Sequence, residues 1–222
     1  MNLTARAAVG ALLPVCAVLT ACGTSGGLDD NGSNLDPCKD VVNGYPCRPY
    51  GTDVGDTVMN FTFYDPDTGE AVHLSDYIKD EEGKRADKVF IITSFAEWCG
   101  ACKLESPEIY ETYTELRDRG VELLMTLNQD AERRDDPDSI AAAATRWESS
   151  VLSMSQGDDQ FLGVLADRSK YLNSFYDINA TPMNMIVGPS FNIYYKITGW
   201  EGKEQFTKIL DAIIKQELEP GS

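Results

Sequence analysis

The chain reads KVFIITSFAEWCGAC over residues 88–102, an apolar run that ends just before two cysteines. A continuous run of this kind is typical of a central β-strand that is covered on both faces. Helical spacing follows over residues 99–119 and ends at Arg119-Gly120, a basic last turn followed by a C-terminal glycine. Cys99 and Cys102 are therefore predicted to lie where a buried strand gives way to a helix.

This position has a chemical consequence for the two cysteines. The N-terminus of a helix carries unpaired amides and the positive end of the dipole, which favour a thiolate and lower its pKa from about 8.5. Cys99 is predicted to be the exposed nucleophile that attacks a substrate disulfide. Cys102, one turn further along, is predicted to be the resolving thiol that breaks the mixed disulfide. A lone Cys-x-x-Cys also serves zinc sites and structural loops, but the flanking strand and helix favour redox chemistry.

The remaining pattern alternates strands and helices and then ends in two strands that meet at a Gly188-Pro189-Ser190 turn. This order predicts an α/β fold with a mixed central sheet and helices on both faces. The expected strands cover residues 58–63, 72–74, 88–95, 121–127, 161–166, 183–187 and 193–197, and the expected helices cover residues 99–119, 139–150, 168–176 and 206–217.

The composition indicates one folded domain with an acidic surface. The chain has 222 residues, of which 42% are hydrophobic, enough for a targeting segment, a linker and one sizeable domain. Its formal net charge is −17, and the acidic residues are spread over loops. No basic cluster offsets this charge, so nucleic acid and anionic lipid are excluded as electrostatic partners.

The N-terminus has the pattern of an export signal. Arg6 is the only charged residue in positions 1–21, and residues 7–20 form an apolar run that is too short to span a bilayer. The run ends in Leu19-Thr20-Ala21-Cys22, which resembles the bacterial lipobox, in which the cysteine is lipidated and becomes the first mature residue. An ordinary cleavage site with an incidental cysteine is the alternative. The pattern predicts a signal peptide over residues 1–21 and an extracytoplasmic protein anchored in the cell envelope through a lipid on Cys22.

Further along, residues 22–51 are predicted to be a flexible tether with a small loop, because they are rich in Gly, Ser, Asn and Asp. Cys38 and Cys47 are eight residues apart in this segment, and an exported protein meets an oxidising compartment. We expect them to form a structural disulfide. A redox relay with the other cysteine pair and a four-cysteine zinc site are the alternatives. The folded domain is then expected over residues 52–218.

The cysteine motif and its surroundings also resemble a known family. Residues 95–102, FAEWCGAC, resemble the active site of thioredoxin, and residues 103–107, KLESP, resemble the TlpA/ResA branch, in which Glu-x-Pro follows the second cysteine. Residues 179–182, NATP, fit the position of the family's cis-proline. The resemblance covers about residues 52–218. It implies a thioredoxin-like fold with an N-terminal β-hairpin extension, and a thiol–disulfide oxidoreductase that needs no cofactor.

The resemblance assigns roles to individual side chains. Pro182, in cis, faces the cysteine pair and helps to hold a substrate peptide against the backbone of Thr181. Trp98 packs beside the disulfide and bounds the docking surface; ordinary core packing is its alternative. Glu105 is implied to tune and deprotonate the thiols, because Thr93 stands where thioredoxin has a buried Asp. A solvated helix glutamate is the alternative for Glu105.

The family also implies partners. These are substrate proteins with disulfides or thiols, and a membrane thiol carrier as electron donor. Reduction of substrate disulfides is the expected direction, although the Gly100-Ala101 pair between the cysteines departs from the Gly-Pro of thioredoxin and leaves the direction open. Thr24, two residues past the lipobox cysteine, is not Asp, and by the enteric sorting rule this favours the outer membrane.

Other functions compete with this interpretation. A copper-binding module on the same fold could use the soft thioethers of Met183 and Met185 near Cys99, but the single histidine, His73, lies in a separate short strand. A peroxidase relative is disfavoured because the Thr-x-x-Cys pocket of peroxiredoxins is absent. An inactive scaffold is disfavoured because both Cys99 and Cys102 are present.

Overall fold

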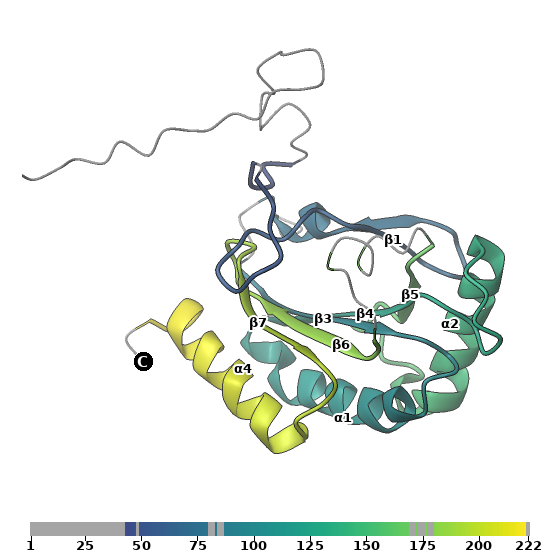
Figure 1. Cartoon of the computed structure of the whole chain (residues 1–222). Helices are drawn as coiled ribbons and strands as arrows, with labels where there is room; N and C mark the ends of the chain where they lie inside the picture. Colours follow the sequence, from purple (N-terminus) through teal and green to yellow (C-terminus); the bar gives the residue numbers. More distant parts are fainter. Residues whose placement is uncertain are drawn as a thin grey trace, which may run out of the picture. The chain divides into compact units, whose positions relative to one another are not determined.

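One mixed sheet organises the chain, with seven strands in the order β2-β1-β5-β4-β3-β6-β7 (Figure 1). The central strands β3, β4 and β5 are parallel, and β6 pairs antiparallel with β3. The strands are β1 (Thr62–Tyr64), β2 (Ala71–His73), β3 (Val89–Phe95), β4 (Val121–Leu127), β5 (Val164–Ala166), β6 (Met183–Val187) and β7 (Ile193–Thr198). The predicted α/β fold with a mixed sheet is confirmed.

This computed structural model describes residues 43–47, 49–79, 83, 87–168, 172, 176 and 180–220. Cys22 and Cys38, and with them the predicted signal peptide and most of the predicted tether, lie outside the described residues. The predicted helix over residues 168–176 is described only at three positions, of which Leu172 is helical. Across these described ranges, no helix combines the length and apolarity that a membrane span requires.

Strand β3 lies inside the sheet, between β4 and β6, and all seven of its side chains are buried. Its neighbours are β4, with Phe95 opposite Leu127, and β6, with Ser94 opposite Met183. A strand without a solvent face is expected to be apolar throughout, which is what residues 89–92 show. Because β3 and β4 are parallel, their carboxyl ends lie at the same edge of the sheet.

Three α-helices share one core with one face of the sheet. They are α1 (Gly100–Leu116), α2 (Pro137–Val151) and α4 (Lys203–Glu217). Helix α1 continues through Pro107, passes into the 3-10 helix η2 (Arg117–Arg119), and ends at Gly120, whose φ of 88° favours glycine. Helix α2 begins where Asp136 accepts a hydrogen bond from the Ser139 amide.

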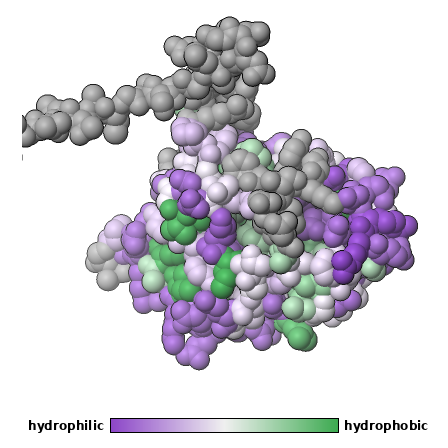
Figure 2. All heavy atoms as spheres, in the orientation of Figure 1, coloured by the Kyte–Doolittle hydropathy of each residue, from purple (hydrophilic) through white to green (hydrophobic). Residues whose placement is uncertain are grey.

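A second core lies on the other face, and it includes Leu74 of the 3-10 helix η1 (Leu74–Tyr77). Its buried members are Tyr45, Val58, Phe61, Phe63, Leu74, Phe90, Ile92, Leu124, Leu165, Leu172, Tyr176, Met183, Met185, Val187, Phe191 and Ile193. The face shown in Figure 2 is largely hydrophilic, as a chain with a net charge of −17 leads one to expect.

Strands β1 and β5 begin later than predicted, and helix α4 begins earlier, at Lys203 and not at residue 206. Strand β1 begins at Thr62 and not at residue 58, because the Val58 amide bonds to the Phe191 carbonyl and not to a neighbouring strand. Strand β5 begins at Val164, after Gly163, whose φ is 80°. In both places apolar side chains are buried without forming a sheet ladder, which an alternating pattern cannot distinguish from a strand.

The packed part of the chain also reaches upstream of the expected boundary at residue 52. Tyr45 is 2% exposed, and its ring centroid lies 4.5 Å from that of Phe191. The Tyr45 hydroxyl donates a hydrogen bond of 3.0 Å to the Val58 carbonyl. Cys47, two residues further on, is disulfide-bonded.

We expect the anchoring of α2 to depend on Trp147. Its ring is 1% exposed and stacks on Phe95 with centroids 5.9 Å apart. Trp147→Ala should lower the free energy of unfolding by about 3–5 kcal/mol, because it leaves a cavity between α2 and the sheet. Trp147→Phe should cost less than about 1.5 kcal/mol, since the ring is kept and the indole nitrogen has no partner among the described residues. Denaturant unfolding measures both, and the exposed Ser149→Ala is the control. Equal losses in the two variants would contradict this packing.

Candidate active site

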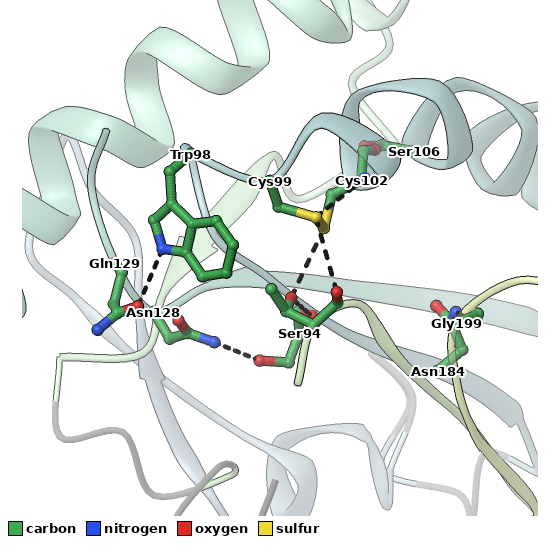
Figure 3. Close-up of a disulfide and its surroundings, with 10 residues drawn as sticks. Ser94, Trp98, Cys99, Cys102, Ser106, Asn128, Gln129, Asn184 and Gly199 are labelled. Atoms are coloured by element: carbon green, nitrogen blue, oxygen red, sulfur yellow. Dashed lines mark hydrogen bonds between the residues drawn. A yellow bond between two sulfur atoms is a disulfide. The ribbon is translucent and has the colours of Figure 1, made fainter. Parts of the chain in front are cut away.

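Cys99 and Cys102 form a disulfide at the start of α1, directly after β3 (Figure 3). Their Cα atoms are 5.3 Å apart. Cys99 is the N-cap of α1, and its sulfur accepts a hydrogen bond of 3.1 Å from the Cys102 amide. A donor in this position would also stabilise a Cys99 thiolate after reduction, and so lower the pKa of that thiol.

The two cysteines differ less in exposure than expected. Cys99 is 4% exposed and Cys102 is fully buried, so the prediction of an exposed nucleophile is wrong for the oxidised state. The physical reason is that the Thr181 carbonyl oxygen lies 3.7 Å from Cys99 Sγ and closes over it. Cys99 nevertheless remains the more accessible of the pair, which agrees with the order of attack inferred from the sequence.

The loop before β6 completes this side of the site. The Thr181–Pro182 peptide bond is cis, as the family resemblance implied. The Thr181 hydroxyl donates to the Ser94 carbonyl at 3.0 Å and lies 3.6 Å from Cys102 Sγ. The Gly199 amide donates to the Pro182 carbonyl at 2.8 Å. The hydrogen bond from Thr181 to Ser94 and the one from Gly199 to Pro182 therefore hold Thr181 close to both sulfur atoms.

Trp98 lies on the other side of the disulfide (Figure 3). Its indole Nε1 donates to Gln129 Oε1 at 3.0 Å, and the Arg133 guanidinium lies 4.2 Å from the ring centroid. Trp98 is partly buried and packs against the α1 core, so core packing and a position beside the disulfide are both realised. Gln129 and Arg133 were not predicted from the sequence; both lie in the long acidic stretch over residues 128–163.

Glu105 points inward from α1 and is only 7% exposed. The alternative of a solvated glutamate is therefore wrong. Burial, together with the charge of Glu108, raises the pKa of Glu105 to about 7, and a hydrogen bond from Asn184 partly opposes the shift. One carboxyl oxygen of Glu105 has no hydrogen-bond partner among the described residues. Glu105 can therefore accept or release a proton near neutral pH.

Two further buried polar groups face α1 near Glu105. Thr93 and Asn184 are directly opposite each other on β3 and β6, and both are fully buried. Asn184 donates to the Gly199 carbonyl at 2.9 Å, while its side-chain oxygen and the Thr93 hydroxyl have no partner within the described part of the chain. Asn184 was not predicted from the sequence, although a lone Asn in the apolar strand MNMIV indicates a special role, since burying an amide is costly.

The side chains of the copper alternative do not come together. Met183 and Met185 lie in the second core, on the face of the sheet opposite to α1 and Glu105. His73 is on the edge strand β2, where its ring bonds to Thr62. In the described ranges, no three His, Cys, Asp or Glu side chains are grouped so as to hold a metal ion.

Several solved structures share this fold. A candidate thiol:disulfide interchange protein DsbE from Chlorobium tepidum has 19% identity and a TM-score of 0.54, covering 74% of this chain and 99% of that chain. DsbF of MTB has 16% identity and a TM-score of 0.51, covering 69% and 95%. The thioredoxin domain of a thiol-disulfide oxidoreductase from Bacteroides vulgatus has 18% identity and a TM-score of 0.50, covering 73% and 99%. No protein of curated function matches the chain by sequence.

These structural similarities show the thioredoxin-like fold, and a match to a family profile shows the family. The profile of the AhpC/TSA family matches residues 54–196. Because that match spans β3, both cysteines of the disulfide and the cis-proline, this chain belongs to the AhpC/TSA family.

Proposed function

We propose that this protein is an extracytoplasmic thiol–disulfide oxidoreductase that reduces disulfides of substrate proteins through Cys99 and Cys102. The observation that carries the proposal is the disulfide at the N-terminus of α1, with the Cys102 amide directed at Cys99 Sγ. Membership of the AhpC/TSA family supports oxidoreductase chemistry in general. The direction of electron flow, the substrates and the extracytoplasmic location are proposed in addition to this general chemistry.

In the first step, the Cys99 thiolate attacks one sulfur of a substrate disulfide. The substrate S–S bond breaks, a Cys99–substrate mixed disulfide forms, and the other substrate sulfur leaves as a thiolate that takes up a proton. The Cys102 amide stabilises the Cys99 thiolate before the attack. The backbone of Thr181, next to the cis-proline, is the surface on which the substrate segment would lie.

In the second step, Cys102 loses its proton and attacks Cys99 Sγ. The mixed disulfide breaks, the Cys99–Cys102 disulfide forms, and the second substrate sulfur leaves and is protonated. The substrate has then gained two electrons and two protons. Glu105 is the proposed acceptor of the Cys102 proton, because it is buried in the same helix with a pKa of about 7. A thiol carrier of the membrane would return the protein to its dithiol form.

A peroxidase is the competing activity within the same family. The position three residues before Cys99 is Ala96, not the Thr that a Thr-x-x-Cys peroxidase pocket needs. We therefore expect disulfide reduction to be faster than consumption of hydrogen peroxide. The reverse order, measured on the same reduced protein, would overturn the proposal.

The cysteine roles lead to a trapping experiment. Cys102→Ser should accumulate mixed disulfides with substrate proteins, because the resolving thiol is gone while Cys99 still attacks. Cys99→Ser should form none and should lose more than about 100-fold of the disulfide-reduction rate, since the nucleophile is gone. Non-reducing electrophoresis and a peptide-disulfide assay with a chemical dithiol measure the two effects. Trapping by Cys99→Ser instead of Cys102→Ser would reverse the assignment.

The carboxyl of Glu105 should govern two pH dependences. With a pKa of about 7 in the fold against an ordinary 4.5, the folded state binds more protons than the unfolded state between these values. The free energy of unfolding of the wild type should therefore fall as pH rises through this range, and Glu105→Gln should remove that part of the fall. Its resolving step should also slow by about 100-fold at pH 8, where the wild-type carboxylate accepts a proton.

Glu108→Gln is the matched variant for this measurement. The charge of Glu108 raises the pKa of Glu105, so removing it should move both pH midpoints downward without abolishing them. Unfolding by denaturant and single-turnover kinetics across pH 4–9 measure the shift. Identical pH profiles for the wild type and Glu105→Gln would exclude Glu105 as the titrating group.

The proposed location rests on the sequence signal and on Cys22. In a bacterial host, the wild-type chain should take up labelled palmitate and sediment with membranes, whereas Cys22→Ser should remain unlabelled and appear in the soluble fraction. Cys16→Ser is the control, because Cys16 lies in the part of the signal that cleavage removes, and this variant should behave as the wild type. Labelling that survives Cys22→Ser would contradict the lipid site.

A further inference from the structure

Arg133 occupies an unusual position next to the disulfide. Its side chain is exposed, its φ is 64°, and its guanidinium lies 4.2 Å from the centre of the Trp98 ring. A positive φ is strained for a residue other than glycine and persists only where the surroundings impose it. Residue 133 therefore has this backbone conformation because the loop around it is tightly specified.

Asp130 provides that specification. Its side chain is 1% exposed and accepts hydrogen bonds from the amides of Glu132 and Arg134, at 3.0 and 2.7 Å, and from the Arg134 guanidinium. The Arg133 amide donates to the Asp130 carbonyl at 3.1 Å. The carboxylate thus folds the loop around itself and directs the Arg133 side chain outward, onto Trp98.

The guanidinium of Arg133 forms no ion pair with the described residues of its loop. Its neighbours are neutralised: Arg134 pairs with Asp130 and Glu132, and Arg146 pairs with Glu97. Among the described residues, no carboxylate lies within ion-pair distance of Arg133. Lys103, next to Cys102, also has no ion pair among the described residues, but Arg133 is the cation that stacks on the ring of Trp98, the residue before Cys99.

Trp98 lies between the Arg133 guanidinium and the disulfide. It immediately precedes Cys99, its ring lies beside the disulfide, and Gln129 holds its indole nitrogen (Figure 3). A substrate segment bound at Cys99 therefore comes within reach of a guanidinium stacked on that ring. A stacked guanidinium keeps its N–H edge available, and that edge matches the two oxygens of a carboxylate.

We propose that Arg133 selects substrate proteins that carry an acidic residue beside the reacting cysteine, by binding its carboxylate. This inference rests on the proposed oxidoreductase function and adds the substrate class. The net charge of −17 opposes the approach of an acidic segment, and the cation at Arg133 would offset that repulsion at this site. Its role is recognition, and it takes no part in the exchange of sulfur bonds.

The test uses three peptide disulfides that differ only in the residue next to the cysteine, which is Glu, Gln or Lys. For the wild type we expect kcat/KM to fall in that order, with about a fivefold step from Glu to Gln that resides in KM and shrinks at high salt. Arg133→Gln should abolish the preference for Glu, and Arg133→Glu should reverse it. Lys208→Gln, which removes a cation on α4, should leave the preference unchanged.

Arg133→Gly separates recognition from folding, because glycine suits the positive φ and keeps the loop relaxed. It should fold with an unchanged melting temperature and show no preference among the peptides. A Glu preference that survives in Arg133→Gln and Arg133→Gly would overturn the proposal. So would an equal loss on all three peptides, since that would mean that Arg133 acts through Trp98 or through the Cys99 thiolate. If the wild type reduced none of the peptides, the proposed function itself would fail.

Discussion

The contact between the Cys102 amide and Cys99 Sγ determines how the rest of this structure must be arranged. A helix that begins at a cysteine leaves its first amides without helical partners, and here the sulfur takes one of them. The contact requires Cys99 to stand immediately after the last residues of β3, so the strand must be central and fully buried to place it accurately. In the proposed mechanism the acidic group that exchanges protons with the thiols comes from α1 itself, because the strand provides Thr93 at that point.

A buried polar cluster is the counterpart of this arrangement. Glu105, Thr93 and Asn184 each bury an oxygen without a partner among the described residues, in a layer otherwise formed by apolar side chains. Burial of this kind is destabilising. The second core, on the opposite face, contains stacked aromatic pairs, Phe61 with Phe63 and Phe90 with Phe191. The buried polar cluster therefore lies on the face of the sheet that α1 covers, beside the disulfide.

The features that could be predicted from the sequence are those with a strong local pattern. The run over residues 89–95, the glycine after η2 and the Thr-Pro step are short-range patterns with one good structural solution, and all appear where expected. Tyr45, Gln129 and Asn184 could not be placed in the same way, because each contacts a residue far away in the chain. These partners are Phe191, Trp98 and Glu105, respectively. Exposure of Cys99 was misjudged for the same reason: the group that covers it, Thr181, is 82 positions away.

The parallel register of β3 and β4 has a further consequence. With Phe95 opposite Leu127, the loops that follow the two strands must emerge side by side, one carrying the cysteines and the other carrying residues 128–136. The second loop is closed by its own carboxylate, Asp130, and joins the first mainly through Trp98 and Glu97. If Arg133 selects substrates as proposed, replacing residues 128–136 would change the preference for acidic substrates while the Cys99–Cys102 pair stays in place.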